Sequence, residues 1–297
     1  MVADKLDALR ARLREYGSCL VAYSGGVDSV FLARMAHEVL GGGALAVIAD
    51  SPSLPRRELA GALAVAKQAG FPVRVIHTRE FEDGRYTANP LNRCYFCKHE
   101  LFGELAPIAR AEKLAVIAYG ENASDAGDFR PGAQAAAEFL VRAPLKEVGL
   151  TKMEIRELSA QLGLSTADKP QMACLSSRVP HGEPVTPEKL RMIEAAENFL
   201  RDLGFCEVRV RHHELRLKSE VRSPKLDHGR LHTSGHLARI ELGPGEIPRF
   251  LADGISAKVT GALQGMGYAQ VVLDSEGYRR GGANPVLPAS AAETFGL

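Results

Sequence analysis

Residues 19–29 read Cys-Leu-Val-Ala-Tyr-Ser-Gly-Gly-Val-Asp-Ser, and this stretch decides the fold. Cys19–Tyr23 is a short apolar run, which is typical of a buried strand in a parallel sheet. Apolar residues at helical spacing then occupy residues 30–40, and three glycines end that pattern. Two glycines between a strand and a helix let backbone N–H groups approach an oxyanion. The stretch therefore predicts a strand, a phosphate-binding loop and a helix.

The rest of the first half repeats this alternation of apolar runs and helical patterns. Further strands are expected over residues 44–49, 73–77 and 115–119, and helices over residues 56–69 and 98–111. Strands that alternate with helices imply right-handed crossovers between parallel neighbours. The predicted fold class is therefore α/β, with a doubly wound and mostly parallel sheet.

The pattern changes in the second half of the chain. Thr151 and Glu154 form a capping box that opens a helix ending at Gly163, and residues 165–187, with three prolines, have no clean period. A helix with Thr186 as its cap, strands over residues 207–211, 238–242 and 269–273, and a helix over residues 247–264 are expected beyond it. These elements predict a smaller α+β domain. The expected divisions are residues 1–168, 169–285 and a tail of residues 286–297.

Composition limits the classes of function. The 297 residues carry 37 Lys and Arg against 36 Asp and Glu, a net charge of +1 that does not support a broad nucleic-acid-binding face. No apolar run is long enough for a signal peptide or a membrane span, so we expect a cytoplasmic protein without a membrane partner. An odd number of cysteines, 5, favours thiols, a metal site or catalysis over disulfides.

The glycine loop offers side chains as well as backbone groups to a phosphate. Ser24 and Ser29 can donate hydroxyl hydrogen bonds, and Asp28 can hold Mg²⁺ or cap the following helix. The loop lacks the lysine of the Walker A motif, so it is a different phosphate loop. A plain glycine turn would explain the two glycines but not their place between a strand and a helix.

Three cysteines form the second candidate site. Cys94 and Cys97 make a C-x-x-C motif, and Cys174 lies far along the chain. Three thiolates can hold three irons of a [4Fe–4S] cluster and leave the fourth iron open. A catalytic thiol without iron, a redox dithiol and a zinc site are the alternatives. Cys19 and Cys206 lie in strand-like or apolar surroundings, where we expect core thiols.

A basic segment interrupts the second domain. Residues 212–236 contain five of the nine histidines together with several arginines and lysines. We expect a solvated insertion, and a metal-binding or anion-binding loop is the alternative.

The loop Ser24-Gly25-Gly26-Val27-Asp28-Ser29 resembles the PP-loop of the ATP pyrophosphatase superfamily, whose members split ATP into AMP and pyrophosphate. Lys152 matches the lysine that neutralises the leaving pyrophosphate in that superfamily. The resemblance implies that ATP and Mg²⁺ bind at the following residues: Ala22, Ser24, Gly25, Gly26, Val27, Asp28, Ser29, Asp50, Ser51, Gly120 and Asn122.

Longer motifs narrow the resemblance to one family. The segments NPLNRCYFCK (residues 89–98), YGENASDAGDFRPG (residues 119–132) and CLSSRVPHGEPVTPEKLRMIEAAE (residues 174–197) resemble LarE proteins, and the likeness extends from about residue 5 to residue 284. LarE proteins are ATP-dependent sulfurtransferases of nickel-pincer cofactor synthesis. The resemblance implies that the carboxylates of pyridinium-3,5-biscarboxylic acid mononucleotide are adenylated and that sulfur then displaces AMP.

The resemblance also implies the source of the sulfur. In single-cysteine members the residue matching Cys174 gives up its own sulfur and becomes dehydroalanine. Members with all three cysteines are similar to those that bind a [4Fe–4S] cluster and transfer a sulfide from its open iron. By this likeness Cys94, Cys97 and Cys174 are the expected cluster ligands and, with Asp28 and Lys152, the expected catalytic residues.

Further residues are assigned by resemblance alone. Substrate binding is expected at Ser177, Arg178, Arg209, Arg211, Asp125, Asp128 and Arg130. Glu197 and Glu241 match residues that bind a divalent metal, and the alternative is that they are solvated carboxylates. For Arg209 and Arg211 the alternative is that they are exposed arginines on a strand. The family also implies a homo-oligomer, a hexamer, and transient contact with other nickel-pincer biosynthesis proteins. The basic insertion of roughly twenty residues after His213 departs from the family pattern.

Two other functions are compatible with parts of the sequence. A tRNA thiolase uses the same loop and a three-cysteine cluster, but it needs a basic RNA-binding face, which the net charge of +1 does not favour. A non-catalytic nickel-binding carrier would use the histidine-rich segment and leave Asp28 and Lys152 without a purpose.

Overall fold

A computed structural model describes residues 2–125, 131–216, 233–252 and 254–278. The chain divides into two compact units, one formed by residues 1–86 and 92–173 and the other by residues 87–91 and 174–297. The main division therefore falls after Ala173, five residues beyond the predicted boundary. The short segment 87–91 joins the second unit, which the sequence pattern does not indicate.

The first unit alternates strands and helices, as predicted. Its strands are β1 (Cys19–Tyr23), β2 (Ala44–Asp50), β3 (Val73–His77) and β4 (Val116–Tyr119). Its helices are α1 (Val2–Tyr16), α2 (Val27–Leu40), α3 (Arg56–Ala69), α4 (Gly84–Thr87), α5 (Arg93–Ala111), α6 (Pro131–Glu138), α7 (Pro144–Glu147) and α8 (Lys152–Gln161). The predicted bounds of β1, β3 and α3 are confirmed.

The strands of this unit form a doubly wound sheet. Across its described residues the order is β3-β2-β1-β4 and every pairing is parallel, which confirms the predicted fold class. The chain moves from β1 to β2 to β3 and then returns to the other side of β1 for β4. In such sheets ligands bind at the carboxyl ends of the strands where the order reverses, here beside β1 and β4.

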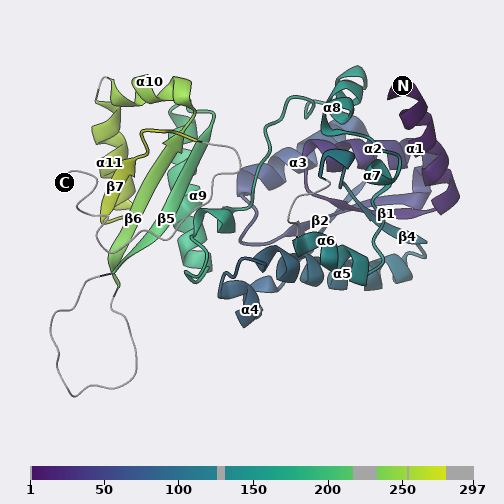
Figure 1. Ribbon diagram of the computed structural model, residues 1–297, viewed down its shortest axis with the longest axis horizontal. Coiled ribbons are helices and arrows are strands. Elements are labelled where there is room, and N and C mark those ends of the chain that lie inside the picture. The colour runs from purple at the N-terminus through teal and green to yellow at the C-terminus, as the bar shows by residue number, and fades with distance from the viewer. Residues whose placement is uncertain (1, 126–130, 217–232, 253, 279–297) are drawn as a thin grey trace, which may run out of the picture. The chain divides into compact units, whose positions relative to one another are not determined.

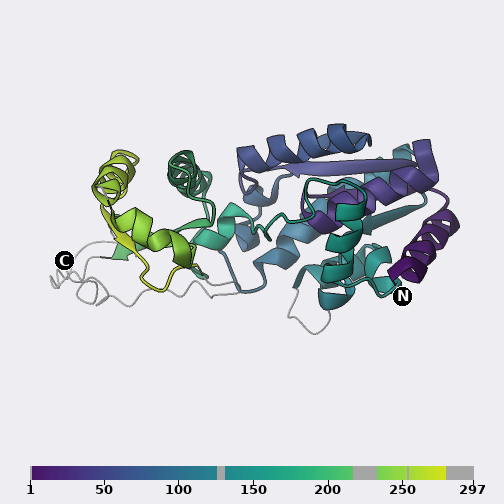
Figure 2. The same cartoon turned by 90° about the horizontal axis from the view of Figure 1, so that it is seen from above.

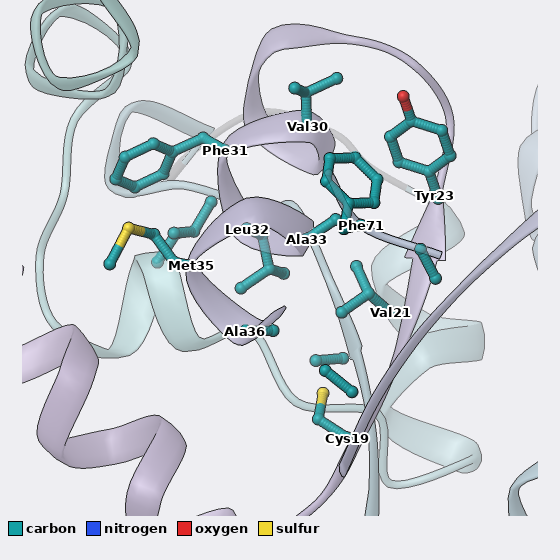
Figure 3. Close-up of a cluster of buried hydrophobic side chains, with 14 of the residues drawn as sticks. Cys19, Val21, Tyr23, Val30, Phe31, Leu32, Ala33, Met35, Ala36 and Phe71 are labelled. Carbon is teal, nitrogen blue, oxygen red and sulfur yellow. The ribbon is translucent and has the colours of Figure 1, made fainter. Parts of the chain in front are cut away.

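The alternation of β1 builds the two layers around the sheet. Cys19, Val21 and Tyr23 point toward α2, whose buried residues include Phe31 and Leu32 (Figure 3). The alternate residues Leu20 and Ala22 pack with residues of α5 and α6 on the opposite face (Figure 1). Because both faces are covered, the strand is apolar throughout, as expected for a central parallel strand.

The second unit packs helices on one face of a smaller sheet. Its strands are β5 (Val208–Arg216), β6 (Thr233–Leu242) and β7 (Gln270–Leu273), and its helices are α9 (Pro187–Asp202), α10 (Ile247–Leu251) and α11 (Ile255–Gly265). In the described part of this unit β5 pairs antiparallel with β6, and β6 pairs parallel with β7. Val208 and Val210 share a core with residues of α9 and α11, which lie on the same side of the sheet (Figure 2).

Three predicted elements differ from the structure. The predicted helix over residues 247–264 is two helices, because Gly254 adopts a left-handed φ of 71° between them. Helix α5 begins at Arg93 and not at residue 98. Both ends of the histidine-rich segment belong to strands β5 and β6, and its middle, residues 217–232, lies outside the described residues, as does the predicted tail.

No helix among the described residues has both the length and the apolar character needed to cross a membrane.

Candidate functional site

Hydrogen bonds of a serine side chain fix the conformation of the phosphate loop. Ser29 Oγ accepts a hydrogen bond from the Ser24 backbone N–H at 3.1 Å and donates to the Gly26 carbonyl at 3.0 Å. Helix α2 begins immediately after Gly26, and no side chain caps it. The N–H groups of an uncapped first turn are the backbone donors that an oxyanion would engage. The loop therefore has the geometry of an anion-binding helix N-terminus.

Only glycine fits at the second position of this loop. Gly25 has a φ of 70°, and a Cβ there would lie 2.5 Å from the Cβ of Ala62 in α3. Gly120, after β4, is also confined, because a Cβ would lie 2.9 Å from the Ser29 backbone nitrogen. The first approach brings the turn after β1 against α3, and the second brings the turn after β4 against the first turn of α2.

A lysine and an aspartate meet beside the loop. Lys152 Nζ lies 2.5 Å from Asp28 Oδ2, and the Asn122 side chain donates to Asp28 Oδ1 at 3.4 Å. The capping box of Thr151 and Glu154, predicted from the sequence and confirmed, places Lys152 at the first position of α8. Three predicted residues from three separate segments are thus brought together where the strand order reverses.

Other residues predicted to bind the nucleotide or the substrate lie at or after the ends of β2 and β4, or outside the described residues. Asp50 ends β2 and forms an ion pair with Arg56, whose guanidinium also donates to the Ser51 carbonyl at 2.8 Å. Asp125 accepts a hydrogen bond from the Asn122 backbone N–H at 3.1 Å. Asp128 and Arg130 lie outside the described residues, so their predicted roles stay predictions.

Lys169 is a functional candidate that the sequence reasoning missed. Its ammonium donates to the Gly25 carbonyl at 3.1 Å and lies 2.8 Å from a Glu58 carboxylate oxygen. Arg156 holds the same segment by donating to the Ala167 and Lys169 carbonyls. The segment that precedes Cys174 is therefore attached to the phosphate loop at Lys169. The partners are 144 residues apart in sequence, so local pattern gives no sign of the contact.

Two of the candidate cysteines lie in the first turn of a long helix. Cys94 and Cys97 are three residues apart near the start of α5, which puts both thiols on one side of that helix. Cys94 is exposed and Cys97 is partly exposed. The helix N-terminus favours the anionic thiolate that binds metals. Among the described residues of either unit, no three His, Cys, Asp or Glu side chains are gathered closely enough to hold a metal ion.

The other cysteines divide between surface and core. Cys19 is buried in the core, and burial raises the pKa of its thiol to about 12, as expected for an inert residue. The prediction for Cys206 is wrong, because this residue is exposed in the turn that precedes β5. Cys174, in the second unit, is exposed.

The backbone of Cys174 is held by a buried ion pair. Its carbonyl accepts hydrogen bonds from Ser177 Oγ at 2.8 Å and from Arg178 Nη1 at 3.0 Å. Arg178 and Glu197 both have 0% side-chain exposure, and two hydrogen bonds of 2.8 and 3.2 Å join them. Because the Arg178 guanidinium is fully buried and already bound to Glu197, it is better placed to position Cys174 than to contact a substrate.

The predicted paired arginines lie on the polar face of the second sheet. Arg209 and Arg211 point away from the core that Val208 and Val210 join, so the predicted alternation along the strand is confirmed. The alternative of exposed strand arginines is wrong, because both are buried. Arg211 donates to the Ser177 carbonyl at 3.0 Å. Burial, followed by the charge of Arg178, lowers the pKa of Arg209.

Both carboxylates with a predicted metal role are engaged by arginines. Glu197 pairs with Arg178 and with Arg201 at 2.9 Å, while Glu241 pairs with Arg211 at 2.9 Å and Arg239 at 3.2 Å. Burial by itself would raise the pKa of Glu197, but the charge and hydrogen bond of Arg178 hold it below the usual value. The alternative of solvated carboxylates is wrong because both groups are buried.

Acid is expected to destabilise the second unit, because two buried histidines in it have lowered pKa values. Burial, with nearby cations, lowers the pKa values of His212 and His213 to about 3, whereas an unfolded histidine titrates near 6.5. The unfolded chain therefore binds more protons below that pH, and stability that is fully present above pH 6.5 is lost as pH falls toward 3. Between pH 7.5 and 5 each histidine is expected to cost about 2 kcal/mol of unfolding free energy.

Urea unfolding followed by circular dichroism checks this expectation. His213→Leu removes one of the two titrating rings, so its loss of stability between pH 7.5 and 5 should be about 2 kcal/mol smaller than that of the wild type. Equal pH dependence in the two proteins would contradict it.

Three known proteins are similar to this chain, and two of them match it over almost its whole length. A pyridinium-3,5-bisthiocarboxylic acid mononucleotide synthase of Lactiplantibacillus plantarum is 32% identical over 295 residues, which is 99% of each chain. An uncharacterized protein of Synechocystis sp. is 42% identical over 287 residues, covering 97% of this chain and 99% of that protein. An uncharacterized protein of Methanocaldococcus jannaschii is 29% identical over 210 residues, covering 70% and 80%. No protein-family model matches.

The match to the synthase covers both units, since it extends over 99% of this chain. The chain therefore belongs to the family of pyridinium-3,5-bisthiocarboxylic acid mononucleotide synthases, the LarE family.

Proposed function

We propose that this protein uses ATP to adenylate the carboxylates of a pyridinium-3,5-biscarboxylic acid mononucleotide and converts them to thiocarboxylates for nickel-pincer cofactor synthesis. The observation that carries the ATP chemistry is the contact of Lys152 with Asp28, 2.5 Å apart, beside the uncapped first turn of α2. The printed name of the Lactiplantibacillus relative supports the identity of the product.

The first unit supplies the adenylating half of the reaction. Backbone N–H groups of α2, with Ser24 and Ser29, are placed to bind the phosphates of ATP. A substrate carboxylate oxygen attacks the α-phosphorus, and the bond to pyrophosphate breaks, which leaves an acyl-adenylate. Lys152 neutralises the departing pyrophosphate. Asp28 would hold Mg²⁺, which supplies further charge neutralisation when it is bound.

The cysteines supply the sulfur-transfer half. Three cysteines would hold a [4Fe–4S] cluster, and their thiol chemistry fits it: Cys94 and Cys97 at the start of α5, and Cys174, whose carbonyl is bound by Arg178. When bound, the cluster would supply a sulfide from the iron that no cysteine ligates. Sulfur adds to the acyl carbon, the bond to AMP breaks, and a thiocarboxylate remains. Arg209, Arg211 and Ser177 bind the phosphate of the substrate in this proposal.

Anaerobic purification and turnover test the proposal. Iron and acid-labile sulfide are expected in the wild type, in equal amounts for the bare cluster and with sulfide in excess when the transferable sulfide is bound, and Cys174 is expected to keep its mass after turnover with ATP and substrate. Cys206→Ala is the matched control, because it removes an exposed thiol outside the three-cysteine set and should keep full iron content. Dehydroalanine at Cys174 after a single turnover would show that the side chain is consumed and would overturn the cluster assignment.

A further inference from the structure

His213 is a buried histidine to which the proposed chemistry gives no task. It follows Arg209 and Arg211 at alternate positions of β5, so its ring lies on the same polar face of the sheet. The residue is 1% exposed, and neither ring nitrogen has a hydrogen-bond partner among the described residues. Across the ladder it faces the apolar side chain of Leu237.

The neighbouring histidine shows the usual arrangement. His212 points to the opposite face, where its ring nitrogens lie 3.2 Å from the Tyr268 hydroxyl and 3.1 Å from His236 Nδ1. Buried imidazoles are normally satisfied in this way, because an unpaired buried donor or acceptor costs free energy. His213 therefore keeps a donor and an acceptor with no described partner.

The surroundings of His213 select the charge of the missing partner. Two arginines act on the His213 ring, Arg239 and Arg211, and both pair with the Glu241 carboxylate. Burial, then Arg239 and Arg211, keep the His213 ring neutral. A neutral imidazole has one N–H to donate, and the two arginines beside it favour an anionic acceptor.

We propose that His213 is a substrate-binding residue, which donates a ring N–H to an anionic oxygen of the pyridinium mononucleotide bound on the face that Arg209 and Arg211 share. This inference rests on the proposed function. The oxygen belongs either to the phosphate or to a carboxylate of the nucleotide, since both groups present the same acceptor chemistry to a neutral donor among arginines.

Calorimetry on the full chain with three probes tests this role. Nicotinic acid mononucleotide carries both groups, nicotinamide mononucleotide carries only the phosphate, and nicotinic acid riboside carries only the carboxylate. His213→Leu should bind the first probe about tenfold more weakly than the wild type, the loss expected for one hydrogen bond to a charged group. The loss should persist with the single-group probe whose oxygen His213 contacts and vanish with the other.

A stability measurement separates binding from packing. Because leucine removes two unsatisfied nitrogens, His213→Leu should melt at the same temperature as the wild type or higher in the absence of probe at pH 7.5. His212→Leu is the matched control on the same strand, and it should melt lower, since it removes the partner of Tyr268 and His236, while keeping the affinity for all probes.

Two outcomes would overturn the inference: one concerns His213 alone, and the other also overturns the proposed function. Unchanged affinity of His213→Leu for every probe that the wild type binds would remove His213 from the site and leave the proposed function intact. Failure of the wild type to bind any of the three probes would remove the substrate class itself, and with it both proposals.

Discussion

Alanine in place of Cys174 is expected to abolish sulfur transfer, by about 10³-fold or more, while the protein still exchanges pyrophosphate with ATP. The thiol is exposed at the start of a short turn, whereas its carbonyl is fixed by Ser177 and Arg178. Removing the sulfur leaves those backbone contacts in place, so the fold of the second unit should survive. The phosphate loop, Asp28 and Lys152 belong to the first unit and lose nothing. Thiocarboxylate formation and ATP–pyrophosphate exchange, measured on the same preparation, separate the two halves of the reaction.

Cys94→Ala and Cys97→Ala extend this test to the other pair. If three thiols act together, each variant should lose iron and sulfur transfer to the same extent as Cys174→Ala. Cys206→Ala again serves as the control with an exposed thiol. Full multiple-turnover activity in Cys94→Ala would show that the pair in α5 has no part in sulfur delivery.

Elements fixed by local pattern were predicted well. The strand Cys19–Tyr23 is apolar throughout because both of its faces are covered, and the capping box at Thr151 needs only two side chains three residues apart. The start of α5 differs from the prediction, since the helix begins at Arg93, directly after an asparagine of the type that often precedes a helix, although Asn92 makes no side-chain capping bond.

Contacts between distant segments could not be predicted from the sequence. Nothing near Arg178 shows that its guanidinium is buried on Glu197, and nothing near Lys169 points to Gly25. Charged residues are read from sequence as exposed, because burial of an unpaired charge is costly. Here Arg211 meets the Glu241 carboxylate of the neighbouring strand and the Ser177 carbonyl, which only the folded chain brings together.

Replacing Lys152 by alanine is expected to slow ATP–pyrophosphate exchange by about 10²- to 10³-fold, the range measured when one preorganised charge-stabilising group is removed from an active site. The Lys152 ammonium lies beside the phosphate loop, where it can neutralise the negative charge that develops on pyrophosphate. Its contact with Asp28 holds it in place before ATP binds. The loss should therefore appear in the exchange rate and, since the backbone N–H groups of α2 remain, much less in the affinity for ATP.

Lys5→Ala is the matched control for this substitution. Lys5 of α1 forms an ion pair at 2.7 Å with Glu154, which lies in α8 with Lys152, and partly exposed pairs of this kind contribute about 1 kcal/mol or less. It should lower stability slightly and leave exchange unchanged. Lys152→Ala also leaves the Asp28 carboxylate without its cation, so Lys152→Ala combined with Asp28→Asn distinguishes loss of catalysis from loss of the pair. If the neutralising role is right, the double variant regains stability but not exchange, because the amide removes the unpaired carboxylate but restores neither the positive charge for the leaving group nor the carboxylate proposed to hold Mg²⁺. Recovery of exchange in the double variant would show that Lys152 serves only to balance Asp28.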